Sequence, residues 1–197
     1  MIIKNRLNFI DSPSLWEEQN KPKETVIHLP ETGRTLKMAT PRKPYQAYIA
    51  GPLFTSLQRK MIEEIASIAA SKGVIPYIPH IHSNEVAQTG SKWKENIFQL
   101  DVRGLDTSDF LIMWADYGFE PDPGTVWEQS RAYALKKPVI ALREDHRNWS
   151  RHTGDFEEKS VMNLMMEESV DIMARNLSEL EKAIEEVVQH LDKKKEK

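Results

Sequence analysis

The chain has 197 residues, 40% of them hydrophobic, which suffices for one well-buried core and is too few for two full domains. Its formal net charge is −3, with 27 basic and 30 acidic residues intermixed, so nucleic acid is not an expected partner. The sequence has no cysteine, which excludes disulfides, thiolate metal sites and a cysteine nucleophile. No apolar run approaches the roughly 20 residues of a membrane span, so we expect no membrane partner and a cytoplasmic location.

Residues 1–44 are expected to be an irregular N-terminal extension. Its prolines are spaced so closely among charged residues that no long helix can form. Within it, the apolar segments 25–29 and 34–38 flank Pro30-Glu-Thr-Gly33. This pattern predicts a β-hairpin with a four-residue turn.

Residues 45–191 alternate apolar runs with segments of helical periodicity, which predicts one domain. Strands are expected at 47–50, 73–78, 109–114, 138–142 and 170–173, and helices at 56–71, 93–105, 124–136 and 178–191. Strand followed by helix, repeated about five times, predicts an α/β fold: a flavodoxin-like or Rossmann-like doubly wound sheet of about five parallel strands with helices on both faces. Residues 192–197 are a charged tail that we expect to be frayed.

Several polar or turn-forming residues follow the predicted strands. Gly51 follows the first strand, Asp101 lies in the helix after the second, and Asp122 and Glu128 follow the third. In a doubly wound sheet, ligands bind outside the carboxyl ends of the strands, so these segments are expected to converge on one crevice. Neither G-x-G-x-x-G nor G-x-x-x-x-G-K occurs, so the pattern does not support a dinucleotide or polyphosphate ligand.

Glu128 is the most informative of these residues. An acidic, glycine-containing turn precedes it, and we place it in the first turn of a helix. There the macrodipole and the unpaired N–H groups would keep it ionised, as a carboxylate nucleophile requires. The alternative is an ordinary first-turn acid, in a helix capped by Asp122 and Thr125.

Five segments, at 48–54, 101–109, 120–128, 137–140 and 163–165, are similar in order and separation to those of a known family. The central one reads Glu120-Pro-Asp-Pro-Gly-Thr-Val-Trp-Glu128. Together they resemble the nucleoside 2-deoxyribosyltransferase family over residues 45–170. The resemblance implies enzymes that move a 2-deoxyribosyl group between purine or pyrimidine bases, with no metal or organic cofactor. The partners implied are therefore a 2′-deoxynucleoside and a free base.

The resemblance also implies roles for single residues. Glu128 matches the nucleophile and Tyr48 the tyrosine that orients it. Asp101 and Asp122 match aspartates that contact base and sugar, and Asn163 matches an asparagine lent by a neighbouring subunit. A homo-oligomer with a shared site is therefore expected. The sequence departs from the family at Val126, Trp127 and Gln129-Ser130, and residues 1–44 have no counterpart.

The chemistry is reasonable on physical grounds. Cleaving an N-glycosidic bond builds positive charge at the anomeric carbon, which a carboxylate on the opposite face can stabilise or capture covalently. Asp101 and Asp122 could then grip sugar hydroxyls or pass a proton to the departing base. Gly51 and Phe54 offer an apolar wall, and Trp127 could stack on the base. Two alternatives remain open: hydrolysis of a nucleoside or nucleoside monophosphate on the same scaffold, and a non-catalytic nucleoside-binding module.

Each candidate residue also has a structural alternative. Tyr48 could be strand packing, Asp101 one half of a buried ion pair, and Asp122 an ordinary turn residue. Asn163 could belong to a helix whose apolar face packs in the core or at an interface.

Three further residues complete the sequence-based expectations. Asp109, at the start of a buried strand, is interpreted as structural, bonding loop N–H groups. His80 and His82 alternate in a way that could point both toward one metal, but no third ligand is evident.

Overall fold

The structure is a computed structural model that describes residues 25–38, 44–83, 91–116, 121–147, 149–153 and 156–195. Residues 1–24 of the predicted extension, Glu120 of the central motif and the last two residues of the predicted tail lie outside the described residues. Among the helices that are described, none is long and apolar enough to cross a bilayer.

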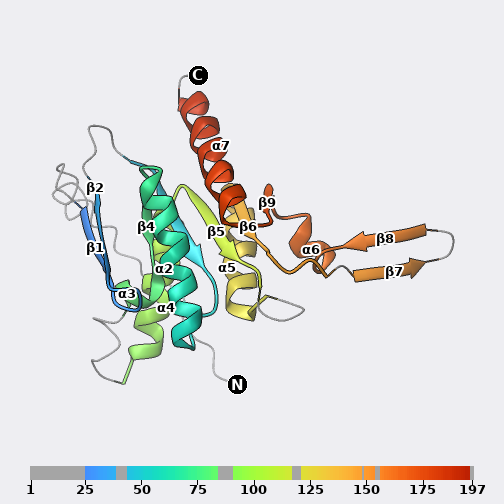
Figure 1. Ribbon diagram of the computed structural model, residues 1–197. Coiled ribbons are helices and arrows are strands. Elements are labelled where there is room, and N and C mark those ends of the chain that lie inside the picture. The colour runs from blue at the N-terminus through green and yellow to red at the C-terminus, as the bar shows by residue number, and fades with distance from the viewer. Residues whose placement is uncertain are drawn as a thin grey trace.

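Five parallel strands form the central sheet, in the spatial order β4-β3-β5-β6-β9 (Figure 1). They are β3 (Gln46–Ala50), β4 (Ile75–Tyr77), β5 (Phe110–Trp114), β6 (Val139–Leu142) and β9 (Ile172–Ala174). Numbered along the chain, the order is 2-1-3-4-5, the flavodoxin-like arrangement, whose switch point lies between β3 and β5. The predicted fold class is confirmed.

Helices cover both faces of the sheet. Helices α2 (Ser56–Ser71) and α7 (Leu177–Lys195) lie on one face, and α4 (Trp93–Thr107) and α5 (Pro123–Ala134) lie on the other. Because side chains alternate along a strand, Ala47 and Ile49 pack toward α2 and α7, whereas Tyr48 belongs to the opposite core layer. This alternation places Tyr48 beneath α4 and α5.

Local sequence signals fix where the helices and strands begin. Thr55 and Gln58 form a capping box at the start of α2, and Asp122 caps α5 immediately before Pro123. Asp109 accepts a hydrogen bond of 2.8 Å from the backbone N–H of Gln46, which ties the start of β5 to the start of β3. The structural interpretation of Asp109 is confirmed.

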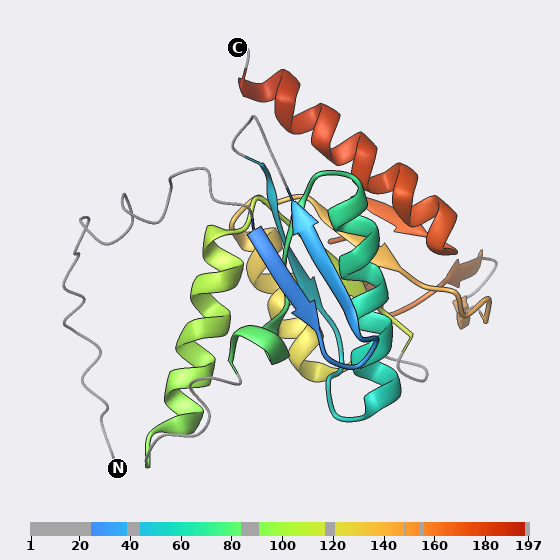
Figure 2. The same cartoon turned by 60° about the vertical axis from the view of Figure 1, so that its left-hand side comes forward.

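The N-terminal hairpin consists of β1 (Thr25–Leu29) and β2 (Arg34–Met38), which pair antiparallel around the four-residue turn that the sequence predicts. It lies alongside α2, at the β4 edge of the sheet (Figure 2). Ile27 and Leu29 are buried in the same core cluster as α2. Glu63 of α2 accepts hydrogen bonds from two backbone N–H groups of the turn, so the hairpin is docked through both apolar and polar contacts.

The C-terminal tail departs from the prediction. Residues 192–195 are not frayed but continue α7. The Tyr45 hydroxyl donates to the Asp192 carboxylate at 2.9 Å, and the Lys195 ammonium lies 3.8 Å from the centre of the Tyr45 ring. Both contacts are with Tyr45, which directly precedes β3, and they hold the end of α7 in place. The charged sequence of the tail alone does not reveal them.

Four short elements were not predicted. Helix α3 (Pro79–His82) follows β4, and α6 (Leu164–Glu167) precedes β9. Strands β7 (Trp149–Thr153) and β8 (Phe156–Ser160) form a hairpin that stands away from the central sheet in Figure 1.

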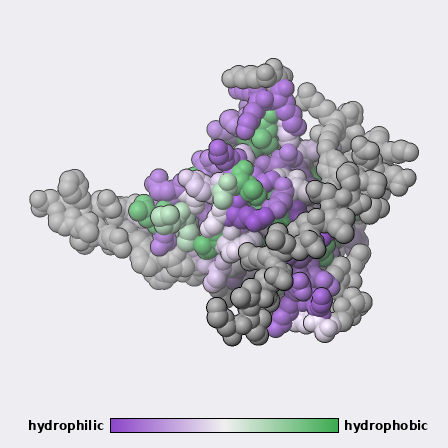
Figure 3. All heavy atoms as spheres, turned by 180° about the vertical axis from the view of Figure 1, so that it is seen from behind, coloured by the Kyte–Doolittle hydropathy of each residue, from purple (hydrophilic) through white to green (hydrophobic). Residues whose placement is uncertain are grey.

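Leu164 and Met165 of α6 are 61% and 77% exposed, and Figure 3 shows small apolar patches among polar side chains on the face seen from behind.

Candidate active site

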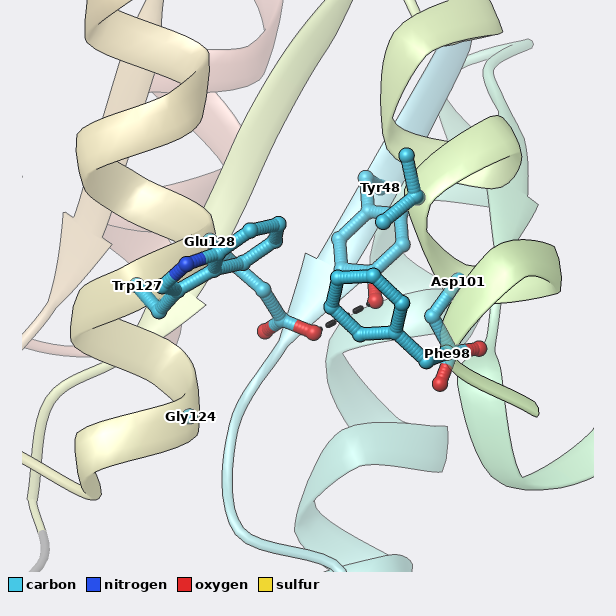
Figure 4. Close-up of a pocket in the computed structure, with 7 residues that line it drawn as sticks. Tyr48, Phe98, Asp101, Gly124, Trp127 and Glu128 are labelled. Atoms are coloured by element: carbon cyan, nitrogen blue, oxygen red, sulfur yellow. Dashed lines mark hydrogen bonds between the residues drawn. The ribbon is translucent and has the colours of Figure 1, made fainter. Parts of the chain in front are cut away.

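A cavity of about 250 Å³ lies between α4 and α5, above β3. Its lining comes from three elements: Tyr48 from β3; Phe98, Asp101 and Val102 from α4; Gly124, Trp127 and Glu128 from α5. Figure 4 shows the Glu128 carboxylate pointing from α5 toward the Tyr48 hydroxyl, with Asp101 on the opposite wall. Four of the predicted site residues, namely Tyr48, Asp101, Trp127 and Glu128, therefore meet in one pocket.

Tyr48 and Glu128 are joined directly. The buried Tyr48 hydroxyl donates a hydrogen bond of 2.5 Å to Oε1 of Glu128. Burial, together with the negative charge of Glu128, raises the pKa of Tyr48 well above its usual value, so the phenol stays protonated. Tyr48 is therefore more than packing: it holds the carboxylate in one orientation.

The position of Glu128 in its helix corrects the sequence-based expectation. Helix α5 begins at Pro123 and has no acidic residue in its first turn, so Glu128 lies in the second turn, beyond the reach of the macrodipole. Burial raises the pKa of Glu128 to about 8; the Tyr48 hydrogen bond opposes this rise, and the charges of Asp101 and Asp122 add to it. The expectation that the helix terminus keeps Glu128 ionised was wrong.

Asp101 faces the same cavity from α4. Its Oδ1 atom is buried and has no hydrogen-bond partner in the part of the chain that the structure describes. Burial raises the pKa of Asp101 to about 6. The alternative of a buried ion pair is not seen among these residues, and a carboxyl without a partner is suited to meeting a donor or acceptor on a ligand.

Two aromatic rings flank the cavity. Phe98 and Trp127 are 50% and 44% exposed, and their ring centroids lie 5.5 Å apart with the planes tilted by 58°. The Arg131 guanidinium lies 5.8 Å from the Trp127 ring. Large apolar side chains at the surface are informative when they gather beside a polar pocket, and these rings suit a planar ligand.

Asp122 lies next to the cavity without lining it. Its Oδ2 atom accepts hydrogen bonds from the backbone N–H groups of Gly124 at 2.9 Å and Thr125 at 3.2 Å. This is the capping role that the sequence offered as its alternative. Asp122 also acts on the site electrostatically, because its charge contributes to the raised pKa of Glu128.

The other predicted residues lie farther from the pocket. Gly51 follows β3 and lies against Ile62 of α2. A Cβ atom at position 51 would come within 2.5 Å of Ile62 Cδ1, so close packing against α2 accounts for a glycine there. Phe54 is 73% exposed in the turn before α2. Asn163 caps α6 by accepting from the N–H of Met165 at 3.0 Å. None of the three lines the described cavity.

The two histidines do not point the same way. They lie in helix α3 and not in a strand. In a helix, residues two apart point in different directions. The His80 Nε2 atom lies 3.5 Å from a Glu63 oxygen, whereas the His82 ring stacks on Tyr77. Within the described ranges, no group of three or more His, Asp or Glu side chains could hold a metal ion.

Sequence reasoning missed Phe98, Val102 and Gly124 as lining residues. Phe98 and Val102 lie three residues before and one after Asp101, on the same helix. Helical spacing from Asp101 was thus the available signal for Phe98. Gly124 admits the Asp122 carboxylate, because a Cβ there would lie 2.9 Å from Asp122 Oδ2.

Comparisons with known proteins agree with the fold and identify a family. Residues 47–183 match a family model described as nucleoside 2-deoxyribosyltransferase. A 2-deoxyribosyltransferase from the psychrotolerant bacterium Bacillus psychrosaccharolyticus superposes with a TM-score of 0.55 at 23% identity, over 69% of this chain and 90% of that one. A conserved protein from Enterococcus faecalis V583 gives 0.54 at 22% identity, over 73% and 98%. At these identities the two structures show the shared fold. A search of curated proteins returned no match.

Proposed function

We propose a transferase reaction from one premise: the chain belongs to the nucleoside 2-deoxyribosyltransferase family. The reaction exchanges the base of a 2′-deoxynucleoside through a covalent deoxyribosyl ester on Glu128, with retention at C1′. One observation carries the proposal. The Tyr48 hydroxyl, 2.5 Å from Glu128 Oε1, orients a carboxylate inside a cavity that has a second carboxyl on its opposite wall.

The chemistry needs two half-reactions. In the first, an oxygen of Glu128 bonds to C1′, the C1′–N bond breaks, and its electron pair leaves with the base, which takes a proton from Asp101. In the second, a nitrogen of the incoming base attacks C1′ and displaces Glu128, and its proton returns to Asp101. Ionised Glu128 starts the cycle, and the hydrogen bond from Tyr48 favours that state.

The lining favours a nucleoside over a nucleotide. Among the described residues that line the cavity there is no lysine or arginine, and two of them are acidic. The Asp122 carboxylate already occupies the N-terminus of α5, where a phosphate would otherwise bind. A phosphate there would meet negative charge. Asp122 is instead suited to accept from sugar hydroxyls, because both capping bonds use only its Oδ2 atom.

Base exchange is the direct test. The protein is incubated with deoxyinosine or thymidine and a second free base, and the products are separated by chromatography. A new deoxynucleoside supports transfer. Free deoxyribose alone would instead identify a hydrolase, and binding without turnover a nucleoside-binding module; either result refutes the proposal.

Glu128→Gln sharpens this test. We expect the variant to lose at least about 1000-fold in kcat while it retains nucleoside binding, because the amide keeps the shape and loses the nucleophile. Glu186→Gln, at an exposed position of α7, is the matched control and should retain exchange. Undiminished exchange by Glu128→Gln would remove Glu128 from the mechanism.

We also propose that a second subunit completes the pocket. Asn163 is exposed at the start of α6, beside the exposed Leu164 and Met165, which suits insertion into a neighbouring copy. We expect Asn163→Ala to raise KM for the nucleoside about 10-fold or more, and light scattering to show an oligomer. A fully active monomer would contradict this part of the proposal.

A further inference from the structure

Tyr77, at the end of β4, touches the candidate catalytic tyrosine from the side. Tyr48 and Tyr77 are register partners in the parallel β3–β4 pair, so their side chains leave the same face of the sheet. Their rings are stacked, with centroids 5.3 Å apart and planes 13° apart. Lateral movement of the Tyr48 ring is therefore blocked on this side.

The Tyr77 ring is itself held from behind. The His82 ring stacks on it at 4.2 Å with the planes 15° apart. His82 is fixed in turn, since its Nδ1 atom lies 2.8 Å from the carbonyl oxygen of Ile78. Three flat rings thus form a continuous stack that ends on Tyr48.

Tyr77 also fixes α4, the helix that carries Asp101. Its hydroxyl donates to the carbonyl oxygen of Leu100 at 3.1 Å, one residue before Asp101. On the next turn, a Cβ atom at Gly104 would lie 2.2 Å from Tyr77 Cζ. Glycine at 104 therefore lets the Tyr77 ring lie directly against α4, and the ring and the helix are in close contact.

We propose that Tyr77 is a positioning residue that sets Tyr48 against Glu128 on one side and Asp101, through α4, on the other. One ring thereby fixes the relative placement of the two carboxyl groups across the cavity. Small displacements of such groups reduce the rate of a positioned reaction steeply. This inference rests on the proposed function for its catalytic consequence, but its geometric part can be tested without turnover.

Tyr77→Leu is the first test. Removing the ring frees Tyr48 and α4, so we expect kcat for base exchange to fall at least about 10-fold while KM changes less than about 3-fold. Tyr77→Phe keeps the stack and loses only the bond to Leu100, so its kcat should fall less. Tyr45→Phe is the matched control: it removes one buried tyrosine hydrogen bond, to Asp192, away from the cavity, and should leave kcat unchanged.

Gly104→Ala perturbs the same ring from the α4 side. Its methyl group should displace Tyr77 and lower kcat by a similar factor. In the Gly104→Ala/Tyr77→Leu double variant, the alanine methyl group has no tyrosine ring to clash with. The double variant should therefore be no slower than Tyr77→Leu alone. Losses that multiply would show two independent effects and overturn the inference. If Tyr77→Leu does not fold, Gly104→Ala alone remains a test, because an unchanged kcat in that variant would overturn the inference.

Titration of Glu128 separates this inference from the proposed function. The Glu128 carboxyl is followed by ¹³C NMR in wild type, Tyr77→Leu and Tyr45→Phe. Burial is the main cause of the raised pKa of Glu128, and the hydrogen bond from Tyr48 opposes it, so freeing Tyr48 in Tyr77→Leu should raise the titration midpoint by at least about half a unit. An unchanged midpoint overturns the inference whether or not the wild type exchanges bases. A wild type that exchanges no bases defeats the proposed function alone.

Discussion

At the scale of single residues, the site depends on two carboxyl groups whose surroundings separate their proton affinities. Burial raises the pKa of Glu128 to about 8 and that of Asp101 to about 6. Between about pH 6 and pH 8 the pocket therefore holds one proton, which lies mainly on Glu128. Because the groups interact, the two values belong to the pair. The reactive arrangement, with Glu128 ionised and Asp101 protonated, is the minor form of this one-proton state, and it exists only while that proton is present.

This arrangement predicts a bell-shaped dependence of kcat/KM on pH. Below about pH 6 both groups are protonated and the nucleophile is lost, whereas above about pH 8 both are ionised and the acid is lost. Exchange should be fastest between these limits. Asp101→Asn should abolish the alkaline fall and leave a single acid fall, moved up from about pH 6 toward the pKa of Glu128, with kcat lower by on the order of 100-fold. A variant that retains both limbs would show that Asp101 is not the acid.

The sequence could predict the pocket residues better than their electrostatics. The family resemblance identifies Glu128, Tyr48 and Asp101 as site residues, but it does not predict the ionisation state of Glu128. That state depends on burial under α4 and β3, which local sequence does not encode. The contact between Tyr77 and Tyr48 could not be predicted for a related reason. It arises from the register of two strands that are separated along the chain.

At the scale of elements, a sustained hydrophobic pattern decided what could be predicted. The five strands of the sheet and the four long helices lie within a few residues of their expected positions, because each presents a sustained hydrophobic pattern. Helices α3 and α6 have four residues each, fewer than the pattern needs. Their placement comes from tertiary contacts instead, such as the Tyr77–His82 stack.

Helix α6 is attached to α5 through one buried side chain. The Gln129 amide donates to the carbonyl oxygen of Met166 at 2.6 Å and to the Ser169 hydroxyl at 2.9 Å. Gln129→Met keeps the length and removes both bonds, so we expect the free energy of unfolding to fall by about 1–3 kcal/mol. Urea denaturation measures this loss.

A matched control is available on the same helix. Ser130 is exposed and bonds only its own helix, to the Val126 carbonyl, in the described contacts. Ser130→Ala should change stability by less than about 0.5 kcal/mol. Equal effects of the two variants would contradict the view that Gln129 joins the helices.

At the scale of the whole molecule, the site lies on the α4–α5 face, beside the switch point between β3 and β5. The N-terminal hairpin lies outside the family match, which begins at residue 47. It nevertheless docks specifically: its turn donates the N–H groups of Glu31 and Thr32 to the buried Glu63 carboxylate at 3.0 and 2.7 Å. The hairpin is thereby fixed against α2, at the β4 edge of the sheet.

The docking should depend on the charge of Glu63. Burial alone would raise the pKa of Glu63, but the hydrogen bonds from the turn outweigh it, and the pKa lies below its usual value. A carboxyl group with a lowered pKa stabilises the fold fully above its unfolded pKa of about 4.3, and the contribution is lost as pH falls through the folded value. The hairpin should therefore loosen on acidification below about pH 4.

Glu63→Gln should loosen the hairpin at neutral pH. The amide offers one acceptor oxygen where two N–H groups require acceptors, so one donor is left unpaired at a cost of about 1–3 kcal/mol. Hydrogen exchange of the Glu31 and Thr32 amides should accelerate about 10-fold or more relative to wild type. Glu64→Gln breaks only the exposed pair with Arg34 and should leave both rates unchanged. Unaltered exchange in Glu63→Gln would mean that the remaining contacts, namely the apolar ones of Ile27 and Leu29 and the Arg59–Glu31 ion pair, hold the hairpin without the carboxylate.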